Sequence, residues 1–221
     1  MSYENNYLYW KKSPLKFWET KASNIDWIKP WDKVLCSENN NYKWFKGGIL
    51  NTCYNCVDRH VNKGKASKVA IIYDSPVTGK KDFITYSELL QKVSSLAASL
   101  HYKGVKKGDR VVLYMPMIPE VIVSMLACAR IGAIHSVVFG GFAAEELANR
   151  IQDVSPKAVI SASCGLEPNR TIDYKKILNE AIQISSHKPA FQIIFQREQY
   201  KCLLDKKGDI AWTDFVDHSK K

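Results

Sequence analysis

The sequence predicts an α/β protein with a mostly parallel sheet flanked by helices, preceded by an irregular tryptophan-rich arm. From about Lys68 onward, short apolar runs alternate with longer amphipathic ones. Strands and helices that alternate in this way require right-handed crossovers and parallel neighbouring strands. The first sixty-odd residues lack this rhythm and carry all but one of the six tryptophans. We therefore expect an arm over residues 1–62 and the first part of an α/β domain over residues 63–221.

The arm has few periodic runs, so its structure is predicted mainly from its five tryptophans. Bulky aromatic side chains can anchor a segment that has little regular structure. The sequence favours one short helix over residues 3–19 and a loop over residues 39–41. We expect the arm to pack on the larger domain rather than to fold alone.

The α/β domain opens with a strand over residues 68–73, a turn, and a second strand over residues 82–85. Thr85 and Glu88 form a capping box, which predicts a helix from residue 86 to about residue 102. The later elements follow from apolar periodicity and from Pro and Gly at the helix ends. They are strands at 110–115, 136–139, 157–162 and 191–195, and helices at 119–131, 143–154 and 174–185.

Charge and composition exclude several functions. The net charge of +10 arises from 32 Lys and Arg against 22 Asp and Glu, but the lysines are scattered in pairs and form no continuous stripe. Nucleic-acid binders usually gather their basic residues on one face, so no nucleic-acid partner is expected. The first ten residues contain no apolar export signal, and prolines and charges interrupt the most apolar stretch, residues 111–139. We expect no membrane partner and a cytoplasmic location, with the mitochondrial matrix as the alternative.

The six cysteines predict free thiols in a reducing compartment, because a chain of 221 residues needs no disulfide staples. Cys53 and Cys56 form a C-x-x-C pair, which is also typical of redox motifs and of half a zinc site. No second pair follows, and His60 adds at most one of the four ligands that structural zinc requires. We therefore expect no metal site.

Two segments follow predicted strands at the sheet edge where α/β proteins bind ligands. The first is the Gly140-Gly141 turn, whose glycines allow a phosphate or a ring to approach the backbone, although tight turn geometry also explains them. The second is a polar loop over residues 161–170 that ends at Arg170. Its guanidinium suits a phosphate, although a surface ion pair is the alternative. The sequence contains no complete P-loop, dinucleotide fingerprint, zinc-protease or nucleophile-elbow motif.

Longer runs in a fixed order resemble the amino-terminal region of the acetyl-CoA and propionyl-CoA synthetases. They extend from about residue 3 to residue 215. They include residues 28–35 (IKPWDKVL), 44–48 (WFKGG), 55–60 (NCVDRH), 108–111 (GDRV), 114–120 (YMPMIPE), 127–133 (ACARIGA) and 136–142 (SVVFGGF).

This resemblance implies an AMP-forming short-chain acid-CoA ligase of the adenylate-forming fold. Such an enzyme joins a short-chain carboxylate to ATP and then transfers the acyl group to CoA. Its substrates are acetate or propionate, ATP with Mg²⁺, and CoA. The exchange of an arginine for Glu167 and the run at residues 73–79 favour propionate slightly.

The resemblance also assigns site residues. In the acetate subgroup, two arginines in the loop that matches residues 165–170 hold the 3′-phosphate of CoA. Here Arg170 keeps the second position and Glu167 occupies the first. The implied CoA-binding residues are Gly141, Glu167, Pro168, Asn169 and Arg170.

The family's phosphate loop, acyl pocket and adenylation lysine are expected beyond residue 221. No catalytic residue is therefore assigned within this chain, and the chain alone is expected to be inactive. Two alternatives stay open: a non-catalytic module that keeps part of a CoA site, and a truncated regulatory or structural relative that binds no ligand.

Overall fold

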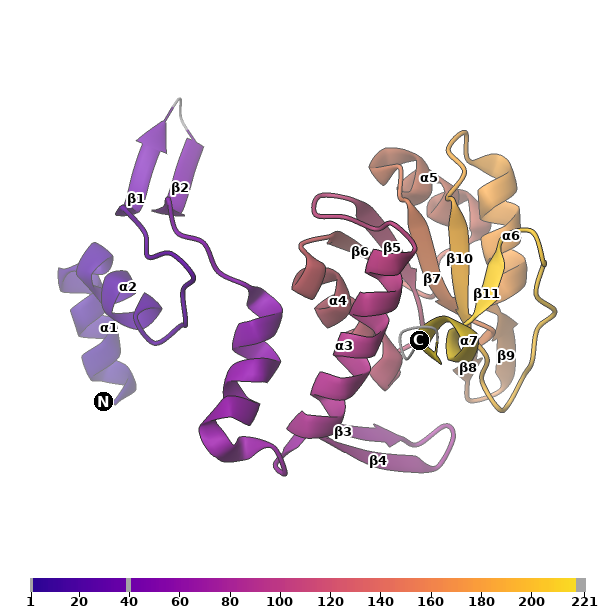
Figure 1. The fold of residues 1–221 in the computed structure, drawn as a ribbon, viewed down its shortest axis with the longest axis horizontal. Helices are drawn as coiled ribbons and strands as arrows, with labels where there is room; N and C mark the ends of the chain where they lie inside the picture. The colour runs from indigo at the N-terminus through magenta and orange to yellow at the C-terminus, as the bar shows by residue number, and fades with distance from the viewer. Residues whose placement is uncertain (1, 39–40, 218–221) are drawn as a thin grey trace. The chain divides into compact units, whose positions relative to one another are not determined.

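The computed structural model describes residues 2–38 and 41–217, and the chain forms two compact units, residues 1–59 and 60–221 (Figure 1). Each unit is described by itself. No helix in the described part of the chain is both long enough and apolar enough to cross a membrane.

Unit 1 contains more regular structure than the sequence predicted. Helices α1 (Tyr3–Lys12) and α2 (Pro14–Ala22) replace the single helix expected over residues 3–19. The expectation was wrong because Pro14 cannot donate a hydrogen bond to the preceding turn and starts a new helix instead. Strands β1 (Lys33–Glu38) and β2 (Asn41–Lys46) then pair antiparallel. The loop predicted at residues 39–41 lies partly outside the described residues, and Asn41 begins β2.

Aromatic rings pack against one another inside unit 1. The rings of Trp27 and Trp31 lie 5.0 Å apart between centroids, and Phe45 lies within 5.5 Å of both. The rings of Trp18 and Trp44 meet edge to face at 6.0 Å. These contacts order the segments between the helices and the hairpin. A helical segment, η1 (Tyr54–Asp58), completes the unit.

A five-stranded sheet in the order β11-β10-β7-β5-β6 forms the centre of unit 2. Every neighbouring pair is parallel, which confirms the predicted α/β class. The strands are β5 (Arg110–Tyr114), β6 (Ile134–Val138), β7 (Ala158–Ala162), β10 (Phe191–Phe195) and β11 (Asp209–Ala211). Strand β11, which has only three residues, was not predicted from the sequence.

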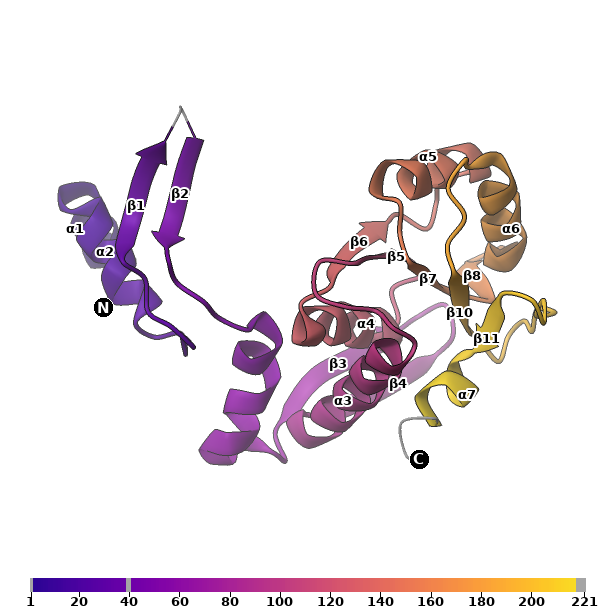
Figure 2. The same ribbon diagram turned by 45° about the horizontal axis from the view of Figure 1, so that its top comes forward.

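Helices cover both faces of this sheet (Figures 1 and 2). Helix α3 (Tyr86–Tyr102) packs against α4 (Pro119–Ile131), and α5 (Ala144–Val154) packs against α6 (Tyr174–Ile184). Apolar residues of α5 and α6 form one core with residues of β5, β7 and β10. A short last helix, α7 (Trp212–Asp217), contacts α3 and β10.

Local signals account for most of these boundaries. The backbone N–H of Glu88 donates to Thr85 Oγ1 at 3.3 Å, and the Glu88 carboxylate accepts from the Thr85 backbone N–H at 2.8 Å, so the predicted capping box opens α3. Pro119 starts α4, and Gly132, in the left-handed conformation with φ of 74°, ends it.

Two antiparallel hairpins flank the sheet. The first joins β3 (Val69–Ser75) to β4 (Lys80–Thr85), close to the predicted strands. The second joins β8 (Cys164–Glu167) to β9 (Arg170–Asp173). The polar loop predicted over residues 161–170 is therefore wrong, because most of that segment belongs to β7, β8 and the tight turn to β9. A helical segment, η2 (Val61–Lys65), precedes the first hairpin.

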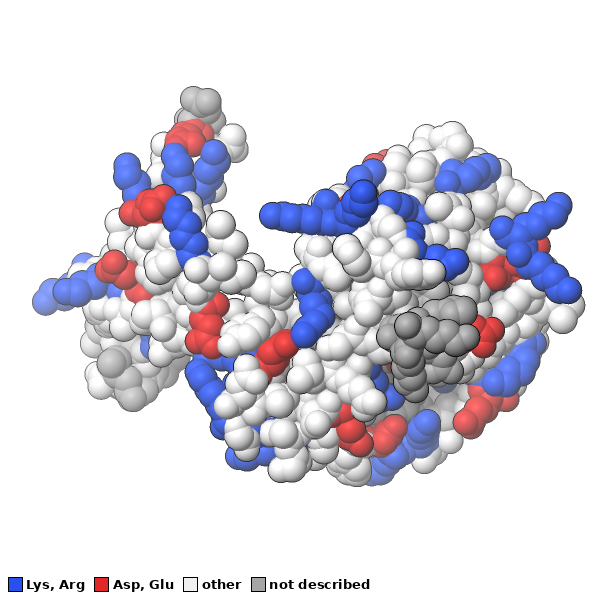
Figure 3. Space-filling model, viewed as in Figure 1, with Lys and Arg blue, Asp and Glu red and all other residues white. Residues whose placement is uncertain are grey.

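Charged side chains are dispersed over both units. Figure 3 shows blue and red residues interspersed on the visible face of each unit, without a continuous basic stripe. The distribution on this face matches the scattered lysines of the sequence.

Candidate functional site

A cavity of about 580 Å³ lies at the carboxyl ends of strands β5 and β6. Its walls come from the β3–β4 hairpin, the segment that follows β5, the Gly140-Gly141 turn, the β8–β9 hairpin, the first residue of α6, and Arg197, which follows β10. Most of the lining is apolar, and Glu167 and Arg197 are the charged residues among the described lining residues. The cavity therefore occupies the sheet edge at which a ligand site was predicted.

Tyr114 at the end of β5 holds the glycine turn in place. Its hydroxyl donates toward the carbonyl oxygens of Gly140 at 3.4 Å and Phe142 at 3.2 Å. Burial raises the pKa of this hydroxyl well above its ordinary value, so it stays a donor. The Tyr114 ring also stacks on the ring of Tyr174, with 4.7 Å between centroids.

Aromatic rings of the chain itself explain why the turn needs two glycines. A Cβ at Gly140 would overlap the Tyr174 hydroxyl and lie 2.8 Å from Cζ of that ring. A Cβ at Gly141 would lie 3.1 Å from Cζ of Phe139. The rings that approach this backbone belong to this chain, so close packing within the chain explains both glycines.

The five predicted CoA-binding residues do not share one environment. Gly141 and Glu167 both line the cavity, from the turn after β6 and from the end of β8. Pro168 and Asn169 form the exposed turn between β8 and β9. Arg170, which opens β9, is not one of the described residues that line the cavity.

Arg170 forms an ion pair with Glu167 across this turn. Its Nε donates to Glu167 Oε2 at 2.7 Å, and its Nη2 donates to Oε1 at 3.2 Å. The hydrogen bond and the charge of each partner lower the pKa of Glu167 and raise that of Arg170. Both side chains are exposed, Arg170 by 69% and Glu167 by 45%. The surface ion pair that the sequence analysis kept as an alternative is the arrangement seen here.

Arg197 is the residue that sequence reasoning missed. It is 8% exposed and lies just after β10. Its backbone N–H donates to Ser163 Oγ at 2.9 Å, and its Nη1 donates to the carbonyl oxygen of Cys164 at 3.3 Å. Its position in the sequence could have indicated it. Arg197 follows the strand predicted at residues 191–195, and the other candidate residues were also sought after the carboxyl ends of strands.

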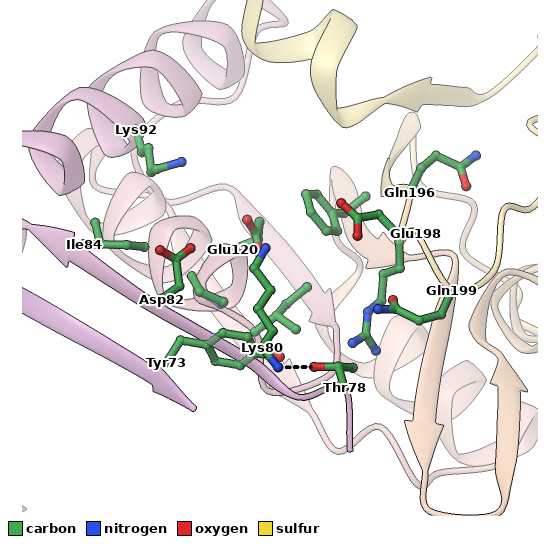
Figure 4. A pocket seen from close by; sticks show the side chains of 14 residues that line it. Tyr73, Thr78, Lys80, Asp82, Ile84, Lys92, Glu120, Gln196, Glu198 and Gln199 are labelled. Carbon is green, nitrogen blue, oxygen red and sulfur yellow. Dashed lines mark hydrogen bonds between the residues drawn. The ribbon is translucent and has the colours of Figure 1, made fainter. Parts of the chain in front are cut away.

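A second cavity of about 130 Å³ shares Tyr73, Thr78, Ile118 and Arg197 with the first and is lined mainly by polar groups (Figure 4). Lys80 and Asp82 of β4 face Glu120 of α4 and Glu198 of the loop after β10. Burial, the largest cause, raises the pKa of Glu120 above its ordinary value. No group of three or more His, Cys, Asp or Glu side chains within residues 2–38 and 41–217 could hold a metal ion.

Fold and site together define an α/β protein with a cavity at the carboxyl edge of a parallel sheet. The model of the AMP-binding enzyme family matches residues 57–213, and that of the acetyl-coenzyme A synthetase N-terminus matches residues 3–56. The chain belongs to the AMP-binding enzyme family. Its resemblance to the short-chain acyl-CoA synthetases is thereby confirmed.

Relatives with similar sequences carry related names. The human mitochondrial acyl-CoA synthetase short-chain family member 3 is 50% identical over 203 residues, which are 91% of this chain and 30% of that protein. The acetyl-coenzyme A synthetase of Mesorhizobium japonicum is 46% identical over 191 residues, 82% of this chain and 29% of that protein. This chain thus spans under a third of the length of both.

Among solved structures, the acetoacetyl-CoA synthetase of Streptomyces lividans superposes with a TM-score of 0.84 at 22% identity. The match covers 98% of this chain and 33% of that protein, and it shows that the two share a fold.

Proposed function

We propose that the chain is the N-terminal portion of a short-chain acyl-CoA synthetase and supplies part of its CoA site. The observation that carries the proposal is the cavity of about 580 Å³, which two of the predicted CoA-binding residues, Gly141 and Glu167, line together. The names of the relatives support the same reaction class. The enzyme would join acetate or propionate to ATP, as the Mg²⁺ complex, and pass the acyl group to CoA, with propionate slightly favoured.

In this proposal the rest of the machinery lies in parts of the relatives that these 221 residues do not span. Transfer of a nucleotidyl group depends on positioned cations and donors around the phosphates. The chain by itself would therefore form no acyl-adenylate. Residues 1–62 would serve as the arm of the large domain, and residues 63–221 as its first part.

Arg170 would bind the 3′-phosphate of CoA once its pairing with Glu167 gives way. The guanidinium lies at an exposed turn, where a phosphate can reach it, and its fork suits two phosphate oxygens. Glu167 competes for the same donors, so binding would be weaker than at a site with two arginines.

The test compares CoA with 3′-dephospho-CoA as substrates of the complete enzyme. We expect Arg170→Ala to raise the KM for CoA about tenfold, the loss of one charge-assisted contact, and to leave adenylation unchanged. The variant should use both substrates equally well. If the wild-type enzyme already uses CoA and 3′-dephospho-CoA with the same KM, Arg170 does not bind the 3′-phosphate.

A further inference from the structure

Tyr174, the first residue of α6, is a buried residue that lines the cavity of about 580 Å³. The residue is 5% exposed, yet its hydroxyl makes no hydrogen bond to any described residue. Burial, the largest cause, raises the pKa of this hydroxyl, and the nearby Arg197 acts in the opposite direction. The group is therefore a protonated donor, and none of its hydrogen-bonding capacity is used by the described residues.

Arg197 lines the same cavity, and it is the one cation among the described lining residues. The one hydrogen-bond acceptor of its guanidinium among described residues is the Cys164 carbonyl, and no described carboxylate lies within ion-pair distance of it. A guanidinium has five N–H donors, and buried arginines are usually paired with an anion. Most of its donor capacity is thus left for a ligand.

The two side chains contact adjacent residues of β8. Arg197 donates to the carbonyl of Cys164, and the Tyr174 ring fills the space above the next residue, Gly165. A Cβ at Gly165 would lie 2.7 Å from Cζ of Tyr174, so only glycine leaves room for the ring. This packing fixes the phenol beside the guanidinium and holds both donors before a ligand arrives.

We infer that Tyr174 and Arg197 form a phosphate-binding subsite inside this cavity, separate from the exposed Arg170. The two groups offer donors and no acceptors, which suits a group that carries several anionic oxygens. The rest of the lining is mainly apolar, with Met115, Val137, Phe139, Leu166 and Ile172 among its members. A ligand with an apolar arm attached to a phosphoryl group fits such a cavity better than a free anion does.

The identity of the ligand rests on the proposed function: the subsite would hold the diphosphate of CoA, while Arg170 contacts the 3′-phosphate. The test uses the purified 221-residue chain and the probes CoA, inorganic pyrophosphate and propionate, with binding measured by calorimetry. Arg197→Met and Tyr174→Phe remove the charge and the hydroxyl. Tyr102→Phe, on a residue that is 81% exposed, is the matched control.

We expect Arg197→Met to weaken the binding of both CoA and pyrophosphate about tenfold and Tyr174→Phe to weaken it about fivefold. Tyr102→Phe should change neither. Because the Tyr174 hydroxyl has no acceptor among the described residues, Tyr174→Phe should unfold at the same temperature as the wild type or higher. That variant keeps the test valid if Arg197→Met fails to fold.

The outcomes separate this subsite from the proposed function. If pyrophosphate binding depends on both residues and CoA does not bind, the subsite stands and the proposed function fails. If CoA binds the wild type and Tyr174→Phe equally well, the subsite is overturned while the proposed function stands. If only propionate responds to the two substitutions, the subsite takes a carboxylate and our assignment is wrong. If no probe binds the wild type, both proposals fail.

Discussion

Arg170 and Arg197 both lie near the carboxyl ends of strands, but their surroundings differ. Arg170 is largely exposed and already paired with Glu167. Arg197 is buried, and the acceptor that its guanidinium has among described residues is a backbone carbonyl. Position along a strand therefore indicates where a cation lies but not whether it is available to a ligand. Burial and pairing decide that, because a buried cation without an anion gains far more from a ligand than an exposed, paired one.

Lys175, next to Tyr174 on α6, differs from Arg197 because it is a buried cation that forms an ion pair with a carboxylate of this chain. Its Nζ lies 2.9 Å from Asp209 Oδ2, and the two side chains are 6% and 0% exposed. Asp209 Oδ2 also accepts from the backbone N–H of Asp205 at 2.7 Å, whereas Oδ1 has no hydrogen-bond partner among the described residues. The pair joins α6 to β11, an edge strand of the sheet.

The largest effect is expected from Lys175→Met, which leaves the Asp209 carboxylate buried without a counter-charge. We expect the free energy of unfolding to fall by about 3–5 kcal/mol, as measured by urea denaturation. Lys176→Met, one residue further on an exposed position, is the control and should change little. Adding Asp209→Asn should restore part of the loss. If Lys175→Met lowers the free energy of unfolding no more than Lys176→Met does, burial does not make this ion pair more stabilising than an exposed one.

A smaller effect is expected from Gly140→Ala, which tests how firmly Tyr174 is held. The new methyl group would overlap the Tyr174 hydroxyl, and overpacking of this kind costs about 1–3 kcal/mol. In a Tyr174→Phe background the substitution should cost less, because the overlapping hydroxyl is gone. Thermal unfolding of the four variants in this cycle measures the difference. Equal costs in both backgrounds would mean that the turn moves and Tyr174 is not fixed.

Local rules were enough to predict most of the α/β unit. Thr85 with Glu88, Pro119 and Gly132 mark helix ends by hydrogen bonds and backbone geometry that involve only a few neighbouring residues. The β8–β9 hairpin escaped prediction because its strands have four residues each and show no clear alternation. Strand β11 is shorter still and follows a long irregular segment.

The candidate site was harder to predict than the fold. Gly141 and Glu167 both line the cavity because the glycine turn follows β6 and the β8–β9 hairpin follows β7, two strands of the parallel sheet, and the general rule for such sheets anticipates this. The importance of Arg197 depends on burial beneath the β8–β9 hairpin, a contact between distant parts of the sequence. No spacing or periodicity in the sequence reports such a contact.

The smallest effect on stability is expected from Glu167→Gln, which breaks the exposed pair without burying a charge. Exposed ion pairs contribute little to folding, so urea denaturation should barely distinguish the variant from the wild type. Ligand binding should change instead. A neutral glutamine no longer competes for Arg170, and the negative charge that repels a phosphate is removed. We expect the purified chain to bind CoA about threefold more tightly, with no gain for 3′-dephospho-CoA.

The pKa of Glu167 determines over which pH range this difference persists. Arg170 lowers that pKa by its hydrogen bond and its charge. The stabilisation from the pair is therefore present above the unfolded-state pKa of glutamate and is lost only as the pH falls through the lowered folded-state value. Glu167 thus stays ionised throughout the neutral range, and the ratio of CoA affinities between variant and wild type should stay constant there. Glu180→Gln, on an exposed position of α6, is the control for the loss of one negative charge. An equal gain with Glu180→Gln would attribute the effect to net charge and would remove Arg170 from the CoA site.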